Sequence, residues 1–253
     1  EVRLLGEHDV VGLIASRDNR RIVGAQVIGR ADGSAEQQLP ADVVVDATGR
    51  GSRLPIWLES LGYSPPQQER VSLGVGYASS HYQVPPAALG TDLVAISAPL
   101  PGRTRGGGLS LIEDGSCLLT LMGVLGDHPP TDPEGFTRFA ADLALPDIHQ
   151  ILQDAEPLDE PVAYRYPTSV RNRYDRLTRF PDGLAVLGDA VCTLNPIYGQ
   201  GMTVAALEAI ALHPHLTNGL PRRYLRDESR ISGLAWAMAL RADLTFPEVE
   251  GPR

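Results

Sequence analysis

The sequence predicts an α/β (α+β) protein in which a domain with a buried parallel sheet is interrupted by a mostly antiparallel sheet. Two short apolar runs, residues 42–47 and 184–187, are each bounded by polar or glycine-rich segments. Such runs are typical of strands that are buried on both faces of a parallel sheet. Between them, residues 65–181 contain repeated β-rich segments separated by Pro and Gly, which favours antiparallel strands.

The first 64 residues contain a predicted hairpin, a strand and a short helix. Residues 10–16 and 22–29 are rich in β-branched side chains and flank a polar turn, as in a hairpin. Residues 42–47 form the first buried strand, which leads into a tight glycine-containing turn at residues 48–52. We expect a short helix over residues 53–61 that ends at the following glycine.

The β-rich stretch predicts a sheet with one helical insertion. The apolar side chains of residues 133–145 fall at helical spacing, with Asp132 as a candidate cap and Pro133 in the first turn. Proline is tolerated there because the first N–H groups of a helix have no partner within it. The expected strands are residues 71–84, 93–98, 107–113, 117–125 and 162–170.

After residue 181 the pattern returns to a buried strand, a glycine-rich turn and an apolar helix over residues 200–212. His213-Pro214-His215 is interpreted as the end of that helix, stopped by proline, and one or two further helices are expected after residue 221. The predicted domain ranges are 1–64, 65–181, 182–213 and 214–253. Because the chain opens on Glu1 with a strand-like pattern and its first Met is Met122, we expect it to be truncated at the N-terminus and also at the C-terminus.

Composition excludes several classes of function. The 253 residues carry a net charge of -9 with basic residues dispersed along the chain, which disfavours a nucleic-acid partner. All basic side chains are Arg, so Schiff-base chemistry and a phosphate-binding lysine are excluded for these residues. Two distant cysteines and six scattered histidines indicate no metal site, and no apolar run is long enough for a membrane span. We expect a cytoplasmic protein; nothing in the sequence indicates its oligomeric state.

The densest chemical signal is the segment from residue 184 to residue 212. It places Asp189 at the end of a predicted parallel strand, where a carboxylate can accept hydrogen bonds from the hydroxyl groups of a ligand. Gly199 and Gly201 allow the backbone to approach a flat ring closely. The helix that follows presents unpaired N–H groups and a positive dipole end, which favours an anion. A plain strand-to-helix turn is the alternative interpretation of the same residues.

The motifs Gly188-Asp189-Ala190, Pro196 and Gly199-Gln200-Gly201-Met202 resemble the second FAD-binding motif of the p-hydroxybenzoate hydroxylase-like (group A) flavoprotein monooxygenases. The upstream Asp-Gly motif of that family resembles Thr48-Gly49 and its flanking residues. The resemblance implies a partial FAD-binding Rossmann-like domain interrupted by a substrate domain. The cofactor-binding residues that it implies are Gly188, Asp189, Ala190, Pro196, Gly199, Gln200, Gly201, Met202, Thr48 and Gly49.

Carried over to this chain, the resemblance implies that Asp189 binds the ribityl chain and that Pro196 lies near the reactive edge of the flavin. In the family, NAD(P)H reduces the flavin, O₂ forms a C4a-hydroperoxide, and one oxygen is transferred to an apolar substrate. The resemblance thus implies an FAD-dependent monooxygenase that hydroxylates or epoxidises an apolar small molecule. No protein nucleophile is needed for this reaction.

Departures from the family pattern leave alternatives open. Thr48 stands where the family has Asp, and no G-x-G-x-x-G fingerprint occurs in the chain. A flavin-dependent reductase of the geranylgeranyl reductase type shares both motifs. A further alternative is a catalytically inactive apo fragment, and we expect weak or no retention of FAD by residues 1–253 alone. Two further groups are candidate cofactor or substrate contacts, although ion pairing and core packing are the commoner roles for such residues. They are Arg165, Arg171, Arg173 and Arg176 with Tyr164, Tyr166 and Tyr174, and the pair Tyr77 and Tyr82.

Overall fold

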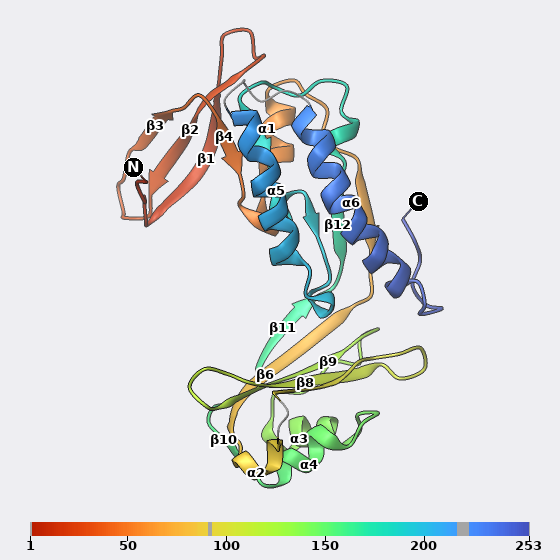
Figure 1. The fold of residues 1–253 in the computed structure, drawn as a ribbon. Coiled ribbons are helices and arrows are strands. Elements are labelled where there is room, and N and C mark those ends of the chain that lie inside the picture. The colour runs from red at the N-terminus through yellow and green to blue at the C-terminus, as the bar shows by residue number, and fades with distance from the viewer. Residues whose placement is uncertain (1, 91–92, 217–222, 253) are drawn as a thin grey trace. The chain divides into compact units, whose positions relative to one another are not determined.

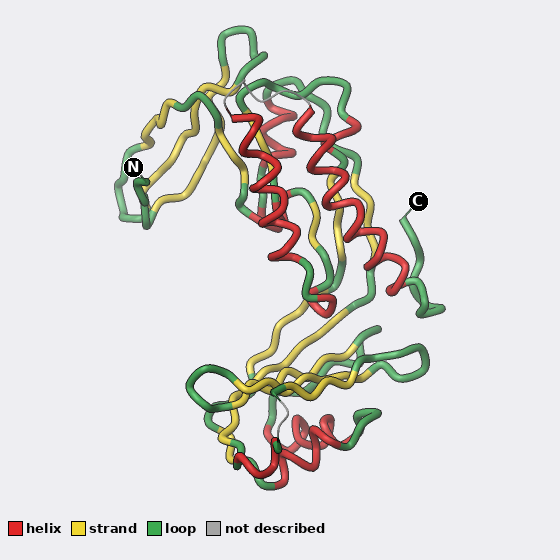
Figure 2. Tube along the Cα trace, viewed as in Figure 1, coloured by secondary structure: helices red, strands yellow, loops and turns green. Residues whose placement is uncertain are grey.

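The computed structural model describes residues 2–90, 93–216 and 223–252, and the contacts between residues divide the chain into two compact units (Figures 1 and 2). Unit 1 is formed by the described residues up to 69 and from 170 to 239. Unit 2 is formed by the described residues from 70 to 169 and from 240 to 252. The domain ranges 1–64, 65–181, 182–213 and 214–253 stay predictions, and residues 217–222 of the last range lie outside the described residues.

Unit 1 begins with an antiparallel sheet in the order β1-β2-β3. Its strands are β1 (His8–Ala15), β2 (Ile22–Gly29) and β3 (Glu36–Pro40). The turn between β1 and β2 is closed by the Ser16 N–H, which donates to the Arg21 carbonyl at 2.8 Å. The hairpin predicted from the β-branched segments is therefore confirmed.

The two apolar runs form a parallel pair, β4 (Val44–Asp46) with β13 (Leu184–Val186). Every residue of β13 is buried, as predicted. The expectation that β4 is buried on both faces is wrong, because Val45 is 39% exposed. The reason is that this sheet has two strands within the described residues, so one face of β4 has little to pack against. The short helix α1 (Leu54–Ser60) follows β4 as predicted and buries Leu54 and Leu58.

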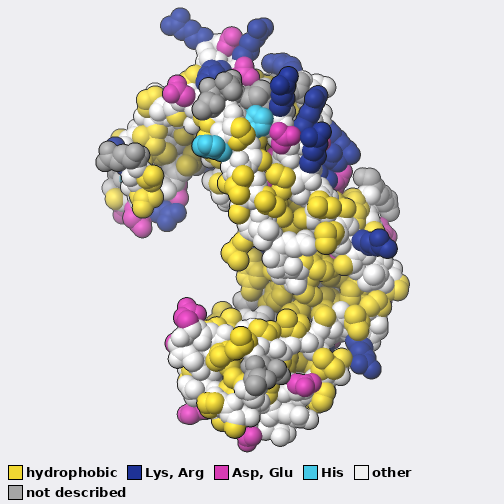
Figure 3. Space-filling model, viewed as in Figure 1, with side chains coloured by type: hydrophobic (Ala, Val, Ile, Leu, Met, Phe, Trp, Pro, Cys, Tyr) yellow, Lys and Arg dark blue, Asp and Glu magenta, His cyan; other side chains and the backbone are white. Residues whose placement is uncertain are grey.

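Two long helices follow, α5 (Gly201–Leu216) and α6 (Arg223–Asp243). All of α5 and the part of α6 up to residue 239 belong to unit 1. The prediction that Pro214 stops the first of them is wrong, since α5 continues to Leu216. In α6, Tyr224, Glu228 and Ser232 recur at a spacing of one helical turn and are all buried. Exposed arginines occupy other positions in its first half and gather there on the surface (Figure 3).

A small sheet and several 3-10 turns lie between the longer strands and helices along the chain. A small sheet has the order β14-β12-β5. Its strands are β5 (Gln68–Val71), β12 (Ser169–Asn172) and β14 (Cys192–Thr193). The 3-10 turns are η1 (Gly49–Gly51), η2 (Tyr174–Arg176), η3 (Gly188–Ala190) and η4 (Pro196–Tyr198).

Unit 2 contains the predicted antiparallel sheet, in the order β10-β6-β9-β8-β7, with β11 also paired to β6. All of these pairings are antiparallel, which confirms the prediction for this part of the chain. The strands are β6 (Val75–Gln83), β7 (Val94–Ser97), β8 (Arg105–Leu111), β9 (Cys117–Gly123), β10 (Glu156–Pro157) and β11 (Val162–Tyr166).

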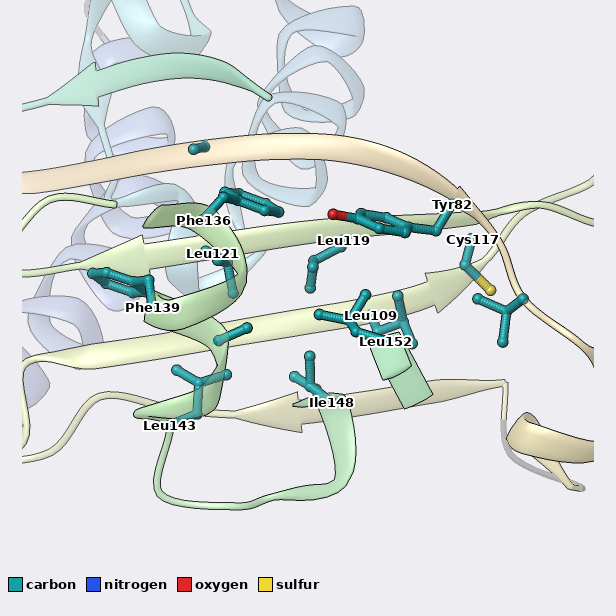
Figure 4. Packing of buried hydrophobic residues seen from close by; sticks show 13 residues of the cluster. Tyr82, Leu109, Cys117, Leu119, Leu121, Phe136, Phe139, Leu143, Ile148 and Leu152 are labelled. Atoms are coloured by element: carbon teal, nitrogen blue, oxygen red, sulfur yellow. The ribbon is translucent and has the colours of Figure 1, made fainter. Parts of the chain in front are cut away.

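Helices pack on one face of this sheet and close its core (Figure 4). They are the short α2 (Pro86–Leu89), α3 (Pro133–Ala141) and α4 (Asp147–Gln153). Phe136 and Phe139 of α3 pack in one cluster with Leu119 and Leu121 of β9. The helix predicted over residues 133–145 is present as α3 but ends earlier than predicted, at Ala141, and α4 is a separate helix that begins after Pro146. The residue before a proline disfavours helical geometry, which keeps the two helices apart. Within the described residues, no helix combines the length and the apolar character that a membrane span requires.

Candidate functional site

The parallel pairing of β4 and β13 brings the two predicted motifs to one edge of their sheet. The register aligns Asp46 with Val186, and the Leu187 N–H donates to the Asp46 carbonyl at 3.0 Å. Each strand is followed by a short turn, η1 after β4 and η3 after β13, and these two turns pack together. Ligands of open α/β folds bind outside the carboxyl ends of parallel strands. Thr48 and Gly49 are thus neighbours of Gly188 and Asp189, although the sequence separates them widely.

The turn after β4 is organised by the buried carboxylate of Asp46. Its Oδ1 accepts hydrogen bonds from the Thr48 N–H at 3.0 Å and the Thr48 hydroxyl at 2.6 Å. Its Oδ2 accepts the Ser52 hydroxyl at 2.5 Å. Gly49 has a φ of 76°, in the left-handed region where a side chain is unfavourable. The Thr48 hydroxyl is therefore used to hold the loop in shape, and Asp46 is an organising residue that the sequence reasoning did not single out.

The turn after β13 opens onto a pocket of about 400 Å³. Of the predicted cofactor-binding residues, six line this pocket and four do not. The pocket is lined by Asp189, Leu194, Pro196, Gly199, Gln200, Gly201, Met202 and Ala205. Ala190 is buried instead, Gly188 lies behind the pocket, and Thr48 and Gly49 lie in the adjacent turn.

Asp189 is the acidic side chain of this pocket. It is partly buried, and burial raises the pKa of its carboxyl group, while the nearby Arg50 guanidinium lowers it. Among the described residues, no side chain or backbone N–H donates a hydrogen bond to this carboxylate. Its acceptor positions therefore remain available to hydroxyl groups of a ligand. Arg50, which the sequence reasoning also did not single out, supplies the positive charge in its surroundings.

Glycine backbone forms the floor of the pocket. Gly199 has a φ of 63°, and a Cβ added to Gly199 or Gly201 would meet no atom within 4 Å, so both face open space. The turn before them is capped by Asn195, whose side chain accepts the Ile197 N–H at 3.2 Å. Gln200 contributes a buried Oε1 with no hydrogen-bond partner in the described part of the chain.

The first turn of α5 begins at this floor. Its first intrahelical bond runs from the Val204 N–H to the Gln200 carbonyl at 3.0 Å, so the preceding N–H groups have no such partner. An electron-rich edge of a flat ligand would be stabilised there by the positive end of the helix dipole. The pocket thus combines a hydroxyl-accepting carboxylate, exposed glycine backbone and a helix start, which fits a ring with a polyol chain.

A buried acid lies on the inner side of the same helix. Glu208 is 0% exposed, and its Oε2 accepts the Gly188 N–H at 2.5 Å. Sequence reasoning missed this residue, which stands one turn from Val204 and from Leu212 on the buried stripe of an otherwise apolar helix. An acidic residue at such a position is the signal that could have identified it, because ionisable side chains are rarely buried without a partner.

Several of the weaker candidates make contacts within the protein. Arg173 is held by Glu69 at 2.7 Å and by Asp175 at 2.8 Å, as in the ion-pair interpretation of the Arg and Tyr stretch. Tyr77 stacks near Tyr164 with ring centroids 6.4 Å apart. His215 of α5 contacts Asp227 of α6 at 3.1 Å. Within the described residues, no group of three or more His, Cys, Asp or Glu side chains could hold a metal ion.

The sequence of the chain was compared with those of known proteins. No family model matches the chain. The chain is 36% identical over 210 residues to Protein Rv3254 of Mycobacterium tuberculosis, a match that covers 82% of this chain and 43% of the relative. The chain therefore spans about half the length of this curated relative.

Two solved structures resemble the chain closely in fold. One is pqsL, a probable FAD-dependent monooxygenase from Pseudomonas aeruginosa, with a TM-score of 0.66 and 16% identity over 95% of this chain and 64% of that chain. The other is the myxobacterial chondrochloren halogenase CndH, an FAD-dependent halogenase, with a TM-score of 0.63 and 17% identity over 93% of this chain and 54% of that chain. The chain therefore shares the fold of these FAD-dependent flavoproteins, as the sequence predicts.

Proposed function

We propose that this chain is part of an FAD-dependent monooxygenase that uses NAD(P)H and O₂ to oxygenate an apolar small molecule. The observation that carries the proposal is the carboxylate of Asp189, which lines a glycine-floored pocket and receives no hydrogen bond from the described residues. A carboxylate without donors in such a pocket is stabilised by a ligand that supplies hydroxyl groups. The ribityl chain of a flavin has this character.

Each side of the pocket has a role in this proposal. Asp189 would bind the ribityl hydroxyls, and the backbone of residues 199–202 would contact the N1 and C2 carbonyl side of the ring. Pro196 would lie near its reactive edge and exclude water there. When bound, FAD supplies the transfer of electrons from NAD(P)H to O₂. The Asp46-centred turn would hold Thr48 and Gly49 beside the cofactor without using the Thr48 hydroxyl as a ligand.

The fold shared with FAD-dependent enzymes supports the proposal that the chain binds FAD. The oxygenation of a substrate is the more specific part of the proposal. A flavin-dependent reductase would use the same pocket, so the two activities are separated by their products. Oxygen consumption coupled to an oxygenated product identifies a monooxygenase. Reduction of an alkene without incorporation of oxygen identifies a reductase.

The test of the proposal is the variant Asp189→Ala. Loss of hydrogen bonds to a charged acceptor is worth about 1.5–3 kcal/mol each, so the affinity for FAD should fall roughly tenfold or more. The affinity is measured by titrating the chain with FAD and following the quenching of flavin fluorescence. Asp32→Ala, at an exposed loop position of the same unit, is the matched control and should bind FAD like the native chain. Equal affinities of Asp189→Ala and the native chain would reject the proposed role of Asp189.

A further inference from the structure

Two buried glutamates of unit 1, Glu208 and Glu228, interact with each other, and Glu208 also contacts the turn that leads into the proposed flavin pocket. Glu208 of α5 is 0% exposed and Glu228 of α6 is 1% exposed. Two ionised carboxylates at such positions would repel each other without water to screen them. A buried acid pair is therefore favourable only when hydrogen bonds, or a proton between the two groups, compensate for the lost solvent.

The contacts of the pair account for part of this compensation. Glu208 Oε2 accepts the Gly188 N–H at 2.5 Å. The second oxygen of each group, Oε1 of Glu208 and Oε1 of Glu228, has no hydrogen-bond donor among the described residues when both groups are ionised. A protonated carboxyl, in contrast, carries a donor of its own and can hydrogen-bond to a neighbouring carboxylate.

The direction of the pKa shifts of the two groups agrees with this arrangement. Burial raises the pKa of Glu208 to about 7, while hydrogen bonds from the Gly188 N–H and from Glu228 oppose the rise. Burial raises the pKa of Glu228 further, to about 8, and the charge of Glu208 adds to the increase. Both pKa values are raised in the same direction, which favours a proton on the pair over two ionised carboxylates.

Several other ionisable groups face the pair. Asp189 of η3 raises the pKa of Glu208, and Arg171 of β12 lowers the pKa of Glu228. Asp175 of η2 raises the pKa of Glu228, and Ser232 of α6 lowers it. Burial above all, with the charge of Glu228, raises the pKa values of Cys192 of β14, Tyr174 of η2 and Tyr224 of α6. Arg171 is the one cation in this set, and its Nη2 also donates to the Ser229 carbonyl at 2.9 Å.

We propose that Glu208 and Glu228 share a proton at neutral pH, and that the Glu208 carboxylate is a positioning residue that fixes the Gly188–Asp189 turn for flavin binding. The shared proton joins α5 to α6, and the hydrogen bond from Gly188 joins both helices to the turn. The shared proton also limits the negative charge behind Asp189. The statement about flavin rests on the proposed function, whereas the shared proton does not.

The shared proton is tested without any flavin. Infrared spectra of the native chain at neutral pH should show the carbonyl band of a protonated carboxyl group, and Glu228→Gln should lack it. Glu59→Gln, which alters an exposed glutamate of α1 in the same unit, is the matched control and should keep the band. A native spectrum without this band would overturn the proposal.

The positioning role is tested by a pair of variants of similar size. Glu208→Gln keeps an oxygen that can accept the Gly188 N–H, and Glu208→Met removes the acceptor without opening a cavity. FAD affinity, titrated by flavin fluorescence, should fall roughly tenfold or more in Glu208→Met and change only a few-fold in Glu208→Gln. Equal losses in the two variants, or none in Glu208→Met, would overturn the role.

The outcomes also separate this inference from the proposed function. Circular dichroism establishes whether each variant folds, and if Glu208→Met does not fold, the infrared comparison of the native chain with Glu228→Gln decides. Equal FAD affinities of Asp189→Ala and the native chain, with the carboxyl band present in the native chain, refute the proposed role of Asp189 and leave the shared proton standing. A native chain that binds FAD without showing the band refutes the inference alone.

Discussion

Asp46 holds the turn after β4 by accepting three hydrogen bonds while it is 5% exposed. We expect Asp46→Ala to lower the free energy of unfolding by about 2–4 kcal/mol, because three donors lose their acceptor in a buried turn. Urea denaturation measures the change. Asp42→Ala, at an exposed position just before the same strand, is the control and should alter stability little. A similar loss in both variants would show that the hydrogen bonds of Asp46 are not the cause.

Residues with a local signal could be predicted from the sequence. Asp189, Pro196 and the glycines at 199 and 201 were identified because their spacing between a strand and a helix has a direct use, and the structure places all four around one pocket. Their role in binding a cofactor stays a prediction. Glu208 and Glu228 were not identified, since their meaning depends on which helix faces which. That information appears only when α5 and α6 pack together.

At the scale of single elements, α3 shows how a helix start is encoded. The side chain of Asp132 accepts the Gly135 N–H at 2.7 Å, and Pro133 occupies the first turn. We expect Asp132→Ala to destabilise the protein by about 1 kcal/mol, the usual effect of losing an N-cap. Asp132→Asn should retain most of the stability, because its side-chain oxygen can accept the same bond. Thermal unfolding of the three proteins tests this order, and equal unfolding temperatures would contradict it.

The limits of element prediction are equally physical. The hairpin of β1 and β2 and the antiparallel sheet were predicted because alternation and turn residues are local properties. The end of α3 at Ala141 and the separate helix α4 were missed, although Pro146 was visible in the sequence. The continuation of α5 past Pro214 was missed because packing against α6, through His215, outweighs the lost N–H in the last turn.

At the scale of the whole molecule, the buried acids set the dependence of stability on pH. The pKa values of Glu208 and Glu228, about 7 and about 8, are raised above their ordinary value of 4.5 by burial. The folded chain thus binds more protons than the unfolded chain between these limits, and stability falls as pH rises through them. In contrast, a hydrogen bond from Arg105 lowers the pKa of Asp127, whose contribution is lost only under acid conditions.

We therefore expect the free energy of unfolding to be greatest near about pH 5 and to fall by a few kcal/mol, on the order of 1.4 kcal/mol per proton and pH unit at most, as the pH rises to about 8. Urea denaturation across this range measures the profile. The double variant Glu208→Gln with Glu228→Gln should be nearly flat over the same interval. A native profile that is flat or rises from pH 5 to pH 8 would contradict the assignment of raised pKa values to this pair.

The adjacency of β4 and β13 has a consequence for how the protein is made. Their pairing joins residue 46 to residue 186, and the whole of unit 2's sheet is synthesised between them. Closing so long a loop is entropically unfavourable and tends to be slow, so the cleft that holds Asp189 is completed late, after the intervening sheet has left the ribosome. Nascent or truncated chains that end before residue 184 lack β13 and every residue that lines this pocket, so the pocket can form only once the chain beyond β13 has been synthesised.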